Sequence, residues 1–142
     1  MAILQAKDQA AVRKEFERLT GPVKLVVFSQ ELVSADLCRQ NEQLMKEVGE
    51  LSDKITVEVL NPQIDRDRAE GYGVSDVPVT VVEGARDYGI RFLGIPAGYE
   101  FSNLIDAIIA TSRGETGLSE ETKATLATLP GEVEIKVFST PT

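Results

Sequence analysis

The strongest constraint on the fold is the nearly continuous apolar run from Val23 to Phe28. Such a run predicts a strand that is buried on both faces, as in the parallel or mixed sheet of an α/β protein. Gly21 and Pro22 precede it and continue a helix poorly, so they end any helix that leads into it. After a short polar loop, a helical pattern begins near Ser34, a candidate N-cap, and extends to about Leu51. The sequence therefore predicts a strand that leads through a short corner into a helix.

Length and charge narrow the classes of protein to which this chain can belong. It has 142 residues, enough for one hydrophobic core but few for two domains. Its net charge of −8 argues against nucleic-acid binding, which needs a cationic face. No apolar run is long enough to span a bilayer, because Asp106 interrupts the best candidate, Leu104–Ala110. The N-terminal residues lack the pattern of a signal peptide, so we expect a cytoplasmic protein.

The reactive side chains are few. The chain has no histidine, so it has neither an imidazole base nor a histidine-ligated metal site. The single cysteine, Cys38, can form neither an intramolecular disulfide nor a thiolate zinc site. We therefore expect no metal and no cofactor in this chain. Any chemistry of the chain alone would use carboxylates, lysine, tyrosine, hydroxyl groups or that one thiol.

The remaining sequence alternates between helical and extended patterns. Helices are predicted over Ile3–Leu19, Ser34–Leu51 and Asp65–Tyr72, and a last one carries Phe101, Leu104, Ile105, Ile108 and Ile109 on one face. Strands are predicted over Ile55–Leu60, Val77–Val82 and Tyr88–Leu93, the last two as a hairpin. The buried face of the second helix is predicted to include Leu37, Leu44, Met45, Val48 and Leu51. The order is α-β-α-β-α-β-β-α, which predicts an α/β fold with a mixed central sheet flanked by helices.

A later segment repeats the sequence pattern of the first strand and of the residues just before it. Leu129–Ser139 matches Leu19–Ser29 at a constant offset, and Ser119–Leu129 predicts a capped helix before it. The similarity of two short apolar strands can arise by chance, or it can mark a tandem repeat. On the second interpretation, residues 1–114 form one complete unit. Residues 115–142 then form a linker, a helix and the first strand of a second, truncated unit.

The apolar strand Val133–Phe138 would lack a sheet of its own in this chain. An unpaired apolar strand tends to find another sheet edge. We expect it either to form a homodimer by pairing with another copy or to pack against the first unit.

Four segments carry a resemblance to known proteins: Pro22–Phe28, Glu50–Lys54, Val74–Pro78 and Tyr88–Phe101. The segment Tyr88–Phe101 contains the most specific motif, Phe-x-Gly-x-Pro-x-Gly-Tyr-Glu-Phe. These segments resemble the protein disulfide oxidoreductases, also called glutaredoxin-like proteins, and the N-terminal domain of the alkyl hydroperoxide reductase flavoprotein subunit. Both families carry two fused thioredoxin folds, so the resemblance implies a thioredoxin-like fold for this chain.

The resemblance also assigns roles to the corner after the first strand. In thioredoxin folds this corner carries a Cys-x-x-Cys pair, but here Ala35 stands at the position of the attacking cysteine and Cys38 at the resolving position. The pair Ala35 and Cys38 is therefore interpreted as a vestigial site. A lone cysteine is usually a small packed hydrophobe. A one-thiol, glutaredoxin-like reaction through Cys38 is the alternative.

Val77 and Pro78 are the second family feature. From sequence alone a trans proline at the start of a strand is expected, because cis X-Pro bonds are rare. The resemblance implies a cis bond instead. It also implies that this pair lies beside the corner and offers a docking position for an extended substrate.

Taken together, the resemblance implies a redox-silent N-terminal unit of a thiol-disulfide oxidoreductase with a structural or docking role. Thiol-disulfide exchange, and with it the contribution to cell redox homeostasis, would belong to a dithiol in the second unit. The partner of the parent protein would be a protein disulfide or a flavin-dependent reductase. A docking module that couples a flavin enzyme of the thioredoxin-reductase type to its partner is a further alternative.

Overall fold

The strand β1 (Val23–Phe28) lies inside a four-stranded sheet in this computed structural model, which describes residues 1–140. It pairs in parallel with β2 (Ile55–Leu60) and antiparallel with β3 (Val79–Glu83). Strand β3 pairs antiparallel with β4 (Ile90–Leu93), so the order across the sheet is β2-β1-β3-β4. The predicted mixed sheet and the hairpin are confirmed.

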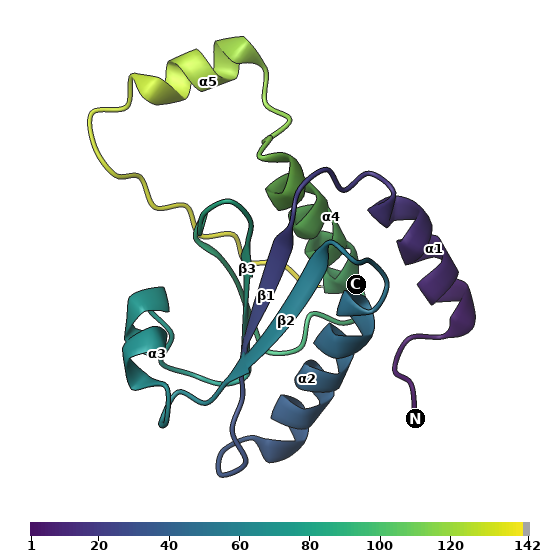
Figure 1. The fold of residues 1–142 in the computed structure, drawn as a ribbon. Helices are drawn as coiled ribbons and strands as arrows, with labels where there is room; N and C mark the ends of the chain where they lie inside the picture. Colours follow the sequence, from purple (N-terminus) through teal and green to yellow (C-terminus); the bar gives the residue numbers. More distant parts are fainter. Residues whose placement is uncertain (141–142) are drawn as a thin grey trace.

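Helices cover both faces of this sheet (Figure 1). Three of them share one hydrophobic cluster: α1 (Ala6–Phe16), α2 (Ala35–Gly49) and α4 (Glu100–Arg113). The short α3 (Arg66–Tyr72) packs on the opposite face. A fifth helix, α5 (Glu120–Ala127), contributes no buried residue. The predicted element order is therefore confirmed through α4. None of the helices within residues 1–140 is long and apolar enough to cross a membrane.

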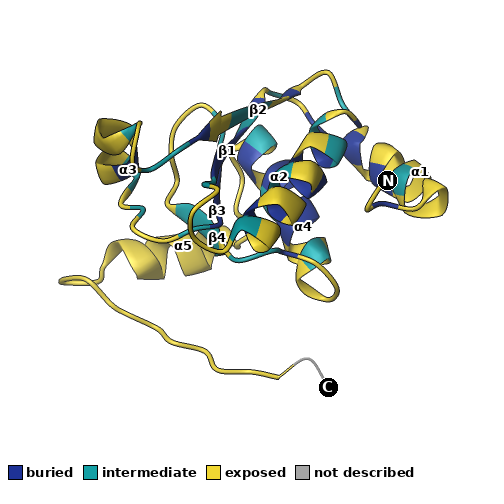
Figure 2. Ribbon diagram, turned by 90° about the horizontal axis from the view of Figure 1, so that it is seen from below, coloured by how far each residue is buried: buried dark blue, intermediate teal, exposed yellow. Residues whose placement is uncertain are grey.

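The side chains of β1 alternate between two hydrophobic clusters. Leu25 and Val27 belong to the larger cluster, beneath α1, α2 and α4. Val26 and Phe28 belong to the smaller cluster, which includes residues of α3. All four are fully buried, as Figure 2 shows for the interior of the sheet. The predicted burial of this strand on both faces is confirmed.

The first helix begins later than predicted, at Ala6, because the residues before it bind to another helix. It also ends earlier, at Phe16, and the amides of Arg18 and Leu19 donate three residues back instead of four. The backbone amides of Ile3 and Leu4 donate to the Glu47 carboxylate on α2, at 2.8–3.0 Å. Burial alone would raise the pKa of Glu47, but the hydrogen bonds from these two amides, with one from the Gln43 side chain and the charge of the N-terminus, lower it overall. The carboxylate thus holds residues 3 and 4 against α2 in a non-helical conformation.

The two strands of the hairpin also begin later than predicted. β3 begins at Val79 and β4 at Ile90, whereas the sequence predicted starts at Val77 and Tyr88. The register Val79–Leu93 defines the first cross-strand pair of this ladder. Before it, Pro78 accepts a hydrogen bond from the amide of Gly94 at 2.8 Å. The polar turn residues before Ile90 remain outside the ladder.

The prediction that Leu37 belongs to the core was wrong, since its side chain is 49% exposed. The buried face of α2 instead runs through Cys38, Asn41, Met45 and Val48, together with Leu44. Each residue of a helix is rotated by about 100° from the one before it. Cys38 faces the sheet, so its neighbour Leu37 faces solvent. The polar Asn41 takes a core position that an apolar pattern does not identify.

Helix ends differ in how far they follow the predicted capping. Ser34 occupies the N-cap of α2, but its side chain makes no capping bond and its backbone is left-handed, with φ 52°. Asp65 likewise occupies an N-cap without capping the helix, because its carboxylate accepts from the Asn61 amide at 2.9 Å. Gly73 ends α3 with φ 68°, as predicted. Ser119 caps α5 by accepting from the Thr122 amide at 3.1 Å.

The segment after α5 has no regular secondary structure up to Thr140. Figure 2 shows it apart from the sheet, and all its described residues are exposed. The expectation that Val133–Phe138 packs against the first unit is therefore not met. Pro141 and Thr142 belong to the predicted second unit but lie outside the described residues.

A charged cluster ties α3 to the sheet. Glu58 on β2 pairs with Lys24 on β1 and with Arg68 on α3, the latter at 2.8 Å. The hydrogen bonds from Lys24 and Arg68 lower the pKa of Glu58. Tyr72 donates its hydroxyl proton to the Glu83 carboxylate at 2.9 Å. These contacts join α3 to the strands β1, β2 and β3 on the face of the sheet that α3 covers.

We predict that acid destabilises the Glu58→Gln variant less than it destabilises the parent protein. The folded-state pKa of Glu58 is lowered, so its contribution is fully present above the unfolded pKa of about 4.3 and is lost as pH falls through the folded pKa. Urea unfolding at a series of pH values between neutral and acid measures this. The free energy of unfolding of the variant should fall less steeply than that of the parent. Glu121→Gln on α5 is the control, and equal slopes for Glu58→Gln and the parent would contradict the prediction.

Candidate functional site

The corner between β1 and α2 is built on the end of the central strand. The ladder with β2 continues one step past Phe28, where the Ser29 amide donates to the Leu60 carbonyl at 2.9 Å. The chain then leaves the sheet and enters α2 through Ser34. Arg39 pairs with Asp36 on α2 and with Glu31 in the loop, the latter at 2.7 Å. This double ion pair ties the loop to the first turn of the helix.

Cys38 lies inside this corner. Its side chain is 1% exposed, and the thiol donates toward the Val33 carbonyl at 3.6 Å. The Cys38 amide donates to the Ser34 carbonyl at 2.9 Å, which closes the first turn of α2. The thiol thus lies one turn into the helix and beneath the loop, where a macromolecular substrate does not reach it.

Ala35 is the first residue of α2 and is partly exposed. A cysteine at a helix N-terminus has a lowered pKa, because the helix dipole stabilises the thiolate. Ala35 occupies that favourable position with a methyl group. The structure therefore places the two predicted site residues one helical turn apart, but only the buried one carries sulfur.

A buried polar contact connects this helix to β3. The Asn41 amide nitrogen donates to the Thr80 hydroxyl at 3.1 Å, and both side chains are fully buried. Asn41 follows Cys38 by one helical turn, and Thr80 follows Pro78 by two strand residues, so each lies on the same face as its neighbour. The contact therefore joins the two parts of the predicted site. Within residues 1–140 the Asn41 carbonyl oxygen has no hydrogen-bond partner.

The Val77–Pro78 bond is cis, as the resemblance implied. Pro78 is buried, and half-buried Val77 packs against the smaller hydrophobic cluster. The backbone amide and carbonyl of Val77 make no hydrogen bond among residues 1–140. Val77 is thus a position whose two backbone hydrogen-bonding groups are unpaired within the described part of the chain.

The corner exposes several apolar side chains to solvent. Leu32 is 90% exposed, and Val33 and Leu37 are about half exposed. These three residues, which we call the corner patch, lie on the loop and on the first turn of α2. A contiguous exposed apolar patch is typical of binding surfaces, and these three residues lie within six positions of one another at the corner.

The chemistry open to this site is limited. Thiol-disulfide exchange within one protein needs an accessible thiolate and a second thiol to resolve the mixed disulfide. The corner has one buried thiol. In the described part of the chain no group of acidic or cysteine side chains is arranged to hold a metal ion.

No model of a known protein family matches the chain, but individual proteins do. It is 24% identical over 136 residues to the F subunit of alkyl hydroperoxide reductase of Pseudomonas putida, a match that covers 96% of this chain and 24% of that protein. The equivalent protein of Escherichia coli is 23% identical over 137 residues, with the same coverage. The chain therefore spans about a quarter of the length of the curated relatives that it matches.

Two solved structures share the arrangement of strands and helices. The alkylhydroperoxide reductase protein AhpF of Enterococcus faecalis superposes with a TM-score of 0.78 at 25% identity, over 89% of this chain and 61% of that one. A protein disulfide oxidoreductase of Aeropyrum pernix gives 0.79 at 27% identity, over 92% and 57%. The fold is thioredoxin-like. The resemblance to these two groups of proteins, predicted from the sequence motifs, is confirmed.

Asn41 and Thr80 are the residues of this site that sequence reasoning missed. Asn41 lies within an amphipathic helix, where a polar residue is expected on the solvent side. Its position one turn after Cys38 was the available signal. Thr80 sits within an apolar strand, where threonine is an ordinary β-branched residue.

We predict that Thr80→Val destabilises the protein by about 1–3 kcal/mol, since it leaves the buried Asn41 side chain without its remaining hydrogen bond. The double variant Asn41→Leu/Thr80→Val should regain most of that loss, because both partners become apolar at similar volume. Urea unfolding with an unchanged m-value measures both. An unaltered midpoint for Thr80→Val would refute this account of the contact.

Proposed function

We propose that this chain is a redox-silent, thioredoxin-like N-terminal unit of a thiol-disulfide oxidoreductase. The observation that carries the proposal is the single thiol of Cys38, 1% exposed, with Ala35 at the helix N-terminus where the attacking thiol would stand. The unit keeps the corner because β1 and α2 belong to the core. It leaves the redox chemistry to a dithiol elsewhere in the parent protein.

The alternative, a one-thiol reaction through Cys38, is less well supported. A reacting cysteine sits in an electropositive and partly exposed position. Arg39, which follows Cys38 in the sequence, is already paired with Glu31 and Asp36. The thiol itself is turned toward the Val33 carbonyl. Attack on a protein disulfide would require the first turn of α2 to open.

The role we assign to the corner is docking. The corner patch is apolar and exposed, and Val77 beside the cis proline has free backbone groups, which suits an extended segment of a partner. Partners of this chemistry are a protein disulfide substrate or a flavin-dependent reductase of the parent protein. The similarity to the F subunits of alkyl hydroperoxide reductases supports the second. The unit would then couple such a reductase to its partner, in the cytoplasm.

We further propose that residues 1–114 form the complete unit and that residues 115–142 open a second one. The repeated pattern of Leu19–Ser29 in Leu129–Ser139 supports this. So does the coverage of the solved relatives, which extend well beyond the matched region. The dithiol would lie in that second unit.

We predict that this chain does not accelerate the reduction of insulin by dithiothreitol, and that Ala35→Cys does. The introduced thiol would lie one helical turn from Cys38, at a Cβ separation of about 5–6 Å. A disulfide needs about 3.5–4.5 Å between Cβ atoms, so the first turn of α2 has to tighten to form it. Insulin turbidity measures the reaction. Ala35→Ser is the matched control and should stay at background. Robust activity of the unaltered chain would overturn the proposal.

Self-association is a separate consequence of the proposed second unit. Val133, Ile135, Val137 and Phe138 are between 63% and 91% exposed, and they lie in an extended, unpaired segment. The strands β2 and β4 each have one free edge. Pairing of Val133–Phe138 with such an edge of another copy would satisfy its backbone and cover these side chains.

We predict concentration-dependent dimers in sedimentation equilibrium. Ile135→Lys/Val137→Lys should give a monomer, because the charged side chains oppose burial on the sheet edge. Ala124→Lys/Ala127→Lys adds the same charge on exposed α5 and should leave the dimer intact. A monomer at every concentration of the parent would contradict the prediction.

A further inference from the structure

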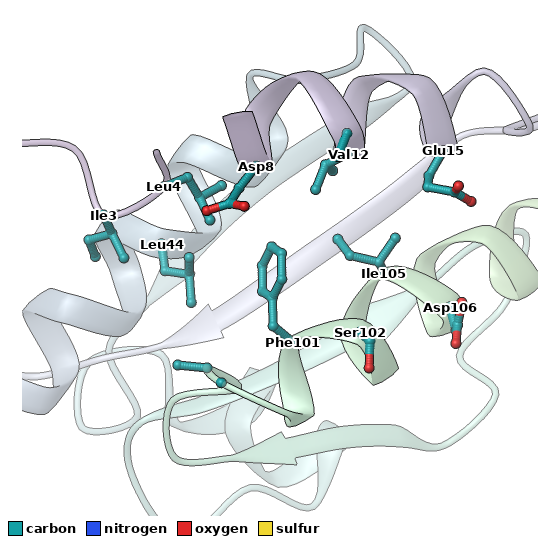
Figure 3. A pocket seen from close by; sticks show the side chains of 13 residues that line it. Ile3, Leu4, Asp8, Val12, Glu15, Leu44, Phe101, Ser102, Ile105 and Asp106 are labelled. Carbon is teal, nitrogen blue, oxygen red and sulfur yellow. The ribbon is translucent and has the colours of Figure 1, made fainter. Parts of the chain in front are cut away.

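A groove of about 660 Å³ runs between α1 and α4, away from the corner. Its volume falls in the range of ligand-binding clefts. The floor is apolar and consists of core residues from three helices and the N-terminal segment: Leu4, Val12, Leu44 and Ile105. The Phe101 ring projects into the space (Figure 3). The groove shares no residue with the corner patch or with the vestigial pair.

The rim of the groove is acidic. Asp8 and Glu15 line it from α1 and Asp106 from α4, and no lysine or arginine is among the lining residues. Figure 3 shows Glu15 and Asp106 toward one end of the groove, and Asp8 farther along α1 on the side of Leu4. Within residues 1–140, neither Asp8 nor Asp106 forms an ion pair, whereas Glu15 pairs with exposed Arg18 at 3.1 Å. Two carboxylates of the rim are thus unneutralised beside an apolar floor.

We propose that this groove binds a short amphipathic helix of a partner protein that carries lysine or arginine beside its apolar face. The apolar floor accepts the anchoring side chains, as in other helix-in-groove complexes. The carboxylates on the two sides would then face the flanking cations. The net charge of −8 also favours the approach of a cationic partner from a distance.

The spacing of the rim residues supports a helical partner. Asp8 and Glu15 lie two turns apart on the same face of α1, about 10 Å along the axis. Val12 lies between them and forms part of the floor. On α4, Asp106 and the floor residue Ile105 are adjacent, so the charge lies at the edge of the apolar surface. A partner helix with cations two turns apart would match this arrangement.

A second copy of this chain fits the groove less well. Its exposed apolar segment Val133–Phe138 carries Glu134, and Glu132 precedes it, against one lysine, Lys136. Like charges placed opposite one another across an interface oppose binding. The groove therefore selects a basic partner rather than the acidic tail of another copy.

The test is a titration of the whole chain into a fluorescein-labelled synthetic peptide, followed by fluorescence anisotropy. The peptide has four helical turns, with leucines along one face and lysines beside them. A scrambled peptide of the same composition, without an apolar face, is the probe for charge alone. We expect saturable binding of the first peptide that weakens with salt, and binding of the scrambled one that is at least about tenfold weaker.

Matched variants distinguish binding in the groove from a general attraction of the peptide to the negatively charged chain. Asp8→Asn/Asp106→Asn should weaken binding about tenfold at low salt, and Ala11→Trp should weaken it by filling the groove. Asp53→Asn/Asp67→Asn removes two exposed carboxylates elsewhere and should change affinity less than about twofold. Thermal unfolding verifies that each variant is folded. Equal losses in the two double variants, equal binding of the scrambled peptide, or no saturable binding would overturn the proposal, whatever the outcome of the insulin assay.

Discussion

Hydrogen bonding along both edges of β1 joins β2 on one side of the sheet to β3 and β4 on the other. Six residue pairs join it to β2 and five join it to β3. Its side chains enter both hydrophobic clusters, so the helices on the two faces of the sheet meet through this strand. A strand bonded at both edges and buried on both faces has little freedom to shift its register. The corner that follows Phe28 therefore starts from a fixed point.

Much of the fold could be predicted because its signals are local in the sequence. The apolar run of β1 and the helical spacing from Phe101 to Ile109 each specify one element without reference to another. Leu37 could not be placed in this way, since its exposure depends on which turn of α2 faces the sheet. The contact of Glu47 with residues 3 and 4 joins distant parts of the chain, so the late start of the first helix, at Ala6, could not be predicted from the local sequence.

Part of the candidate site could likewise be predicted from the sequence, and part could not. Ala35, Cys38 and the cis bond before Pro78 followed from a resemblance to known proteins, because their positions match a motif. The Asn41–Thr80 contact did not, since neither residue is unusual at its place in the sequence. The apolar floor of the groove consists of residues that each look like ordinary core. Their grouping beside Asp8 and Asp106 arises only when α1 packs against α4.

The burial of Cys38 has a consequence for measurement. It is the only thiol in the chain, and it lies beneath the first turn of α2. A small alkylating reagent reaches it only when that turn opens, so the rate of labelling in native conditions reports the free energy of local opening. Cys38 thus serves as a native probe of the corner. Its labelling measures the local opening of this one region without any probe being added to the sequence.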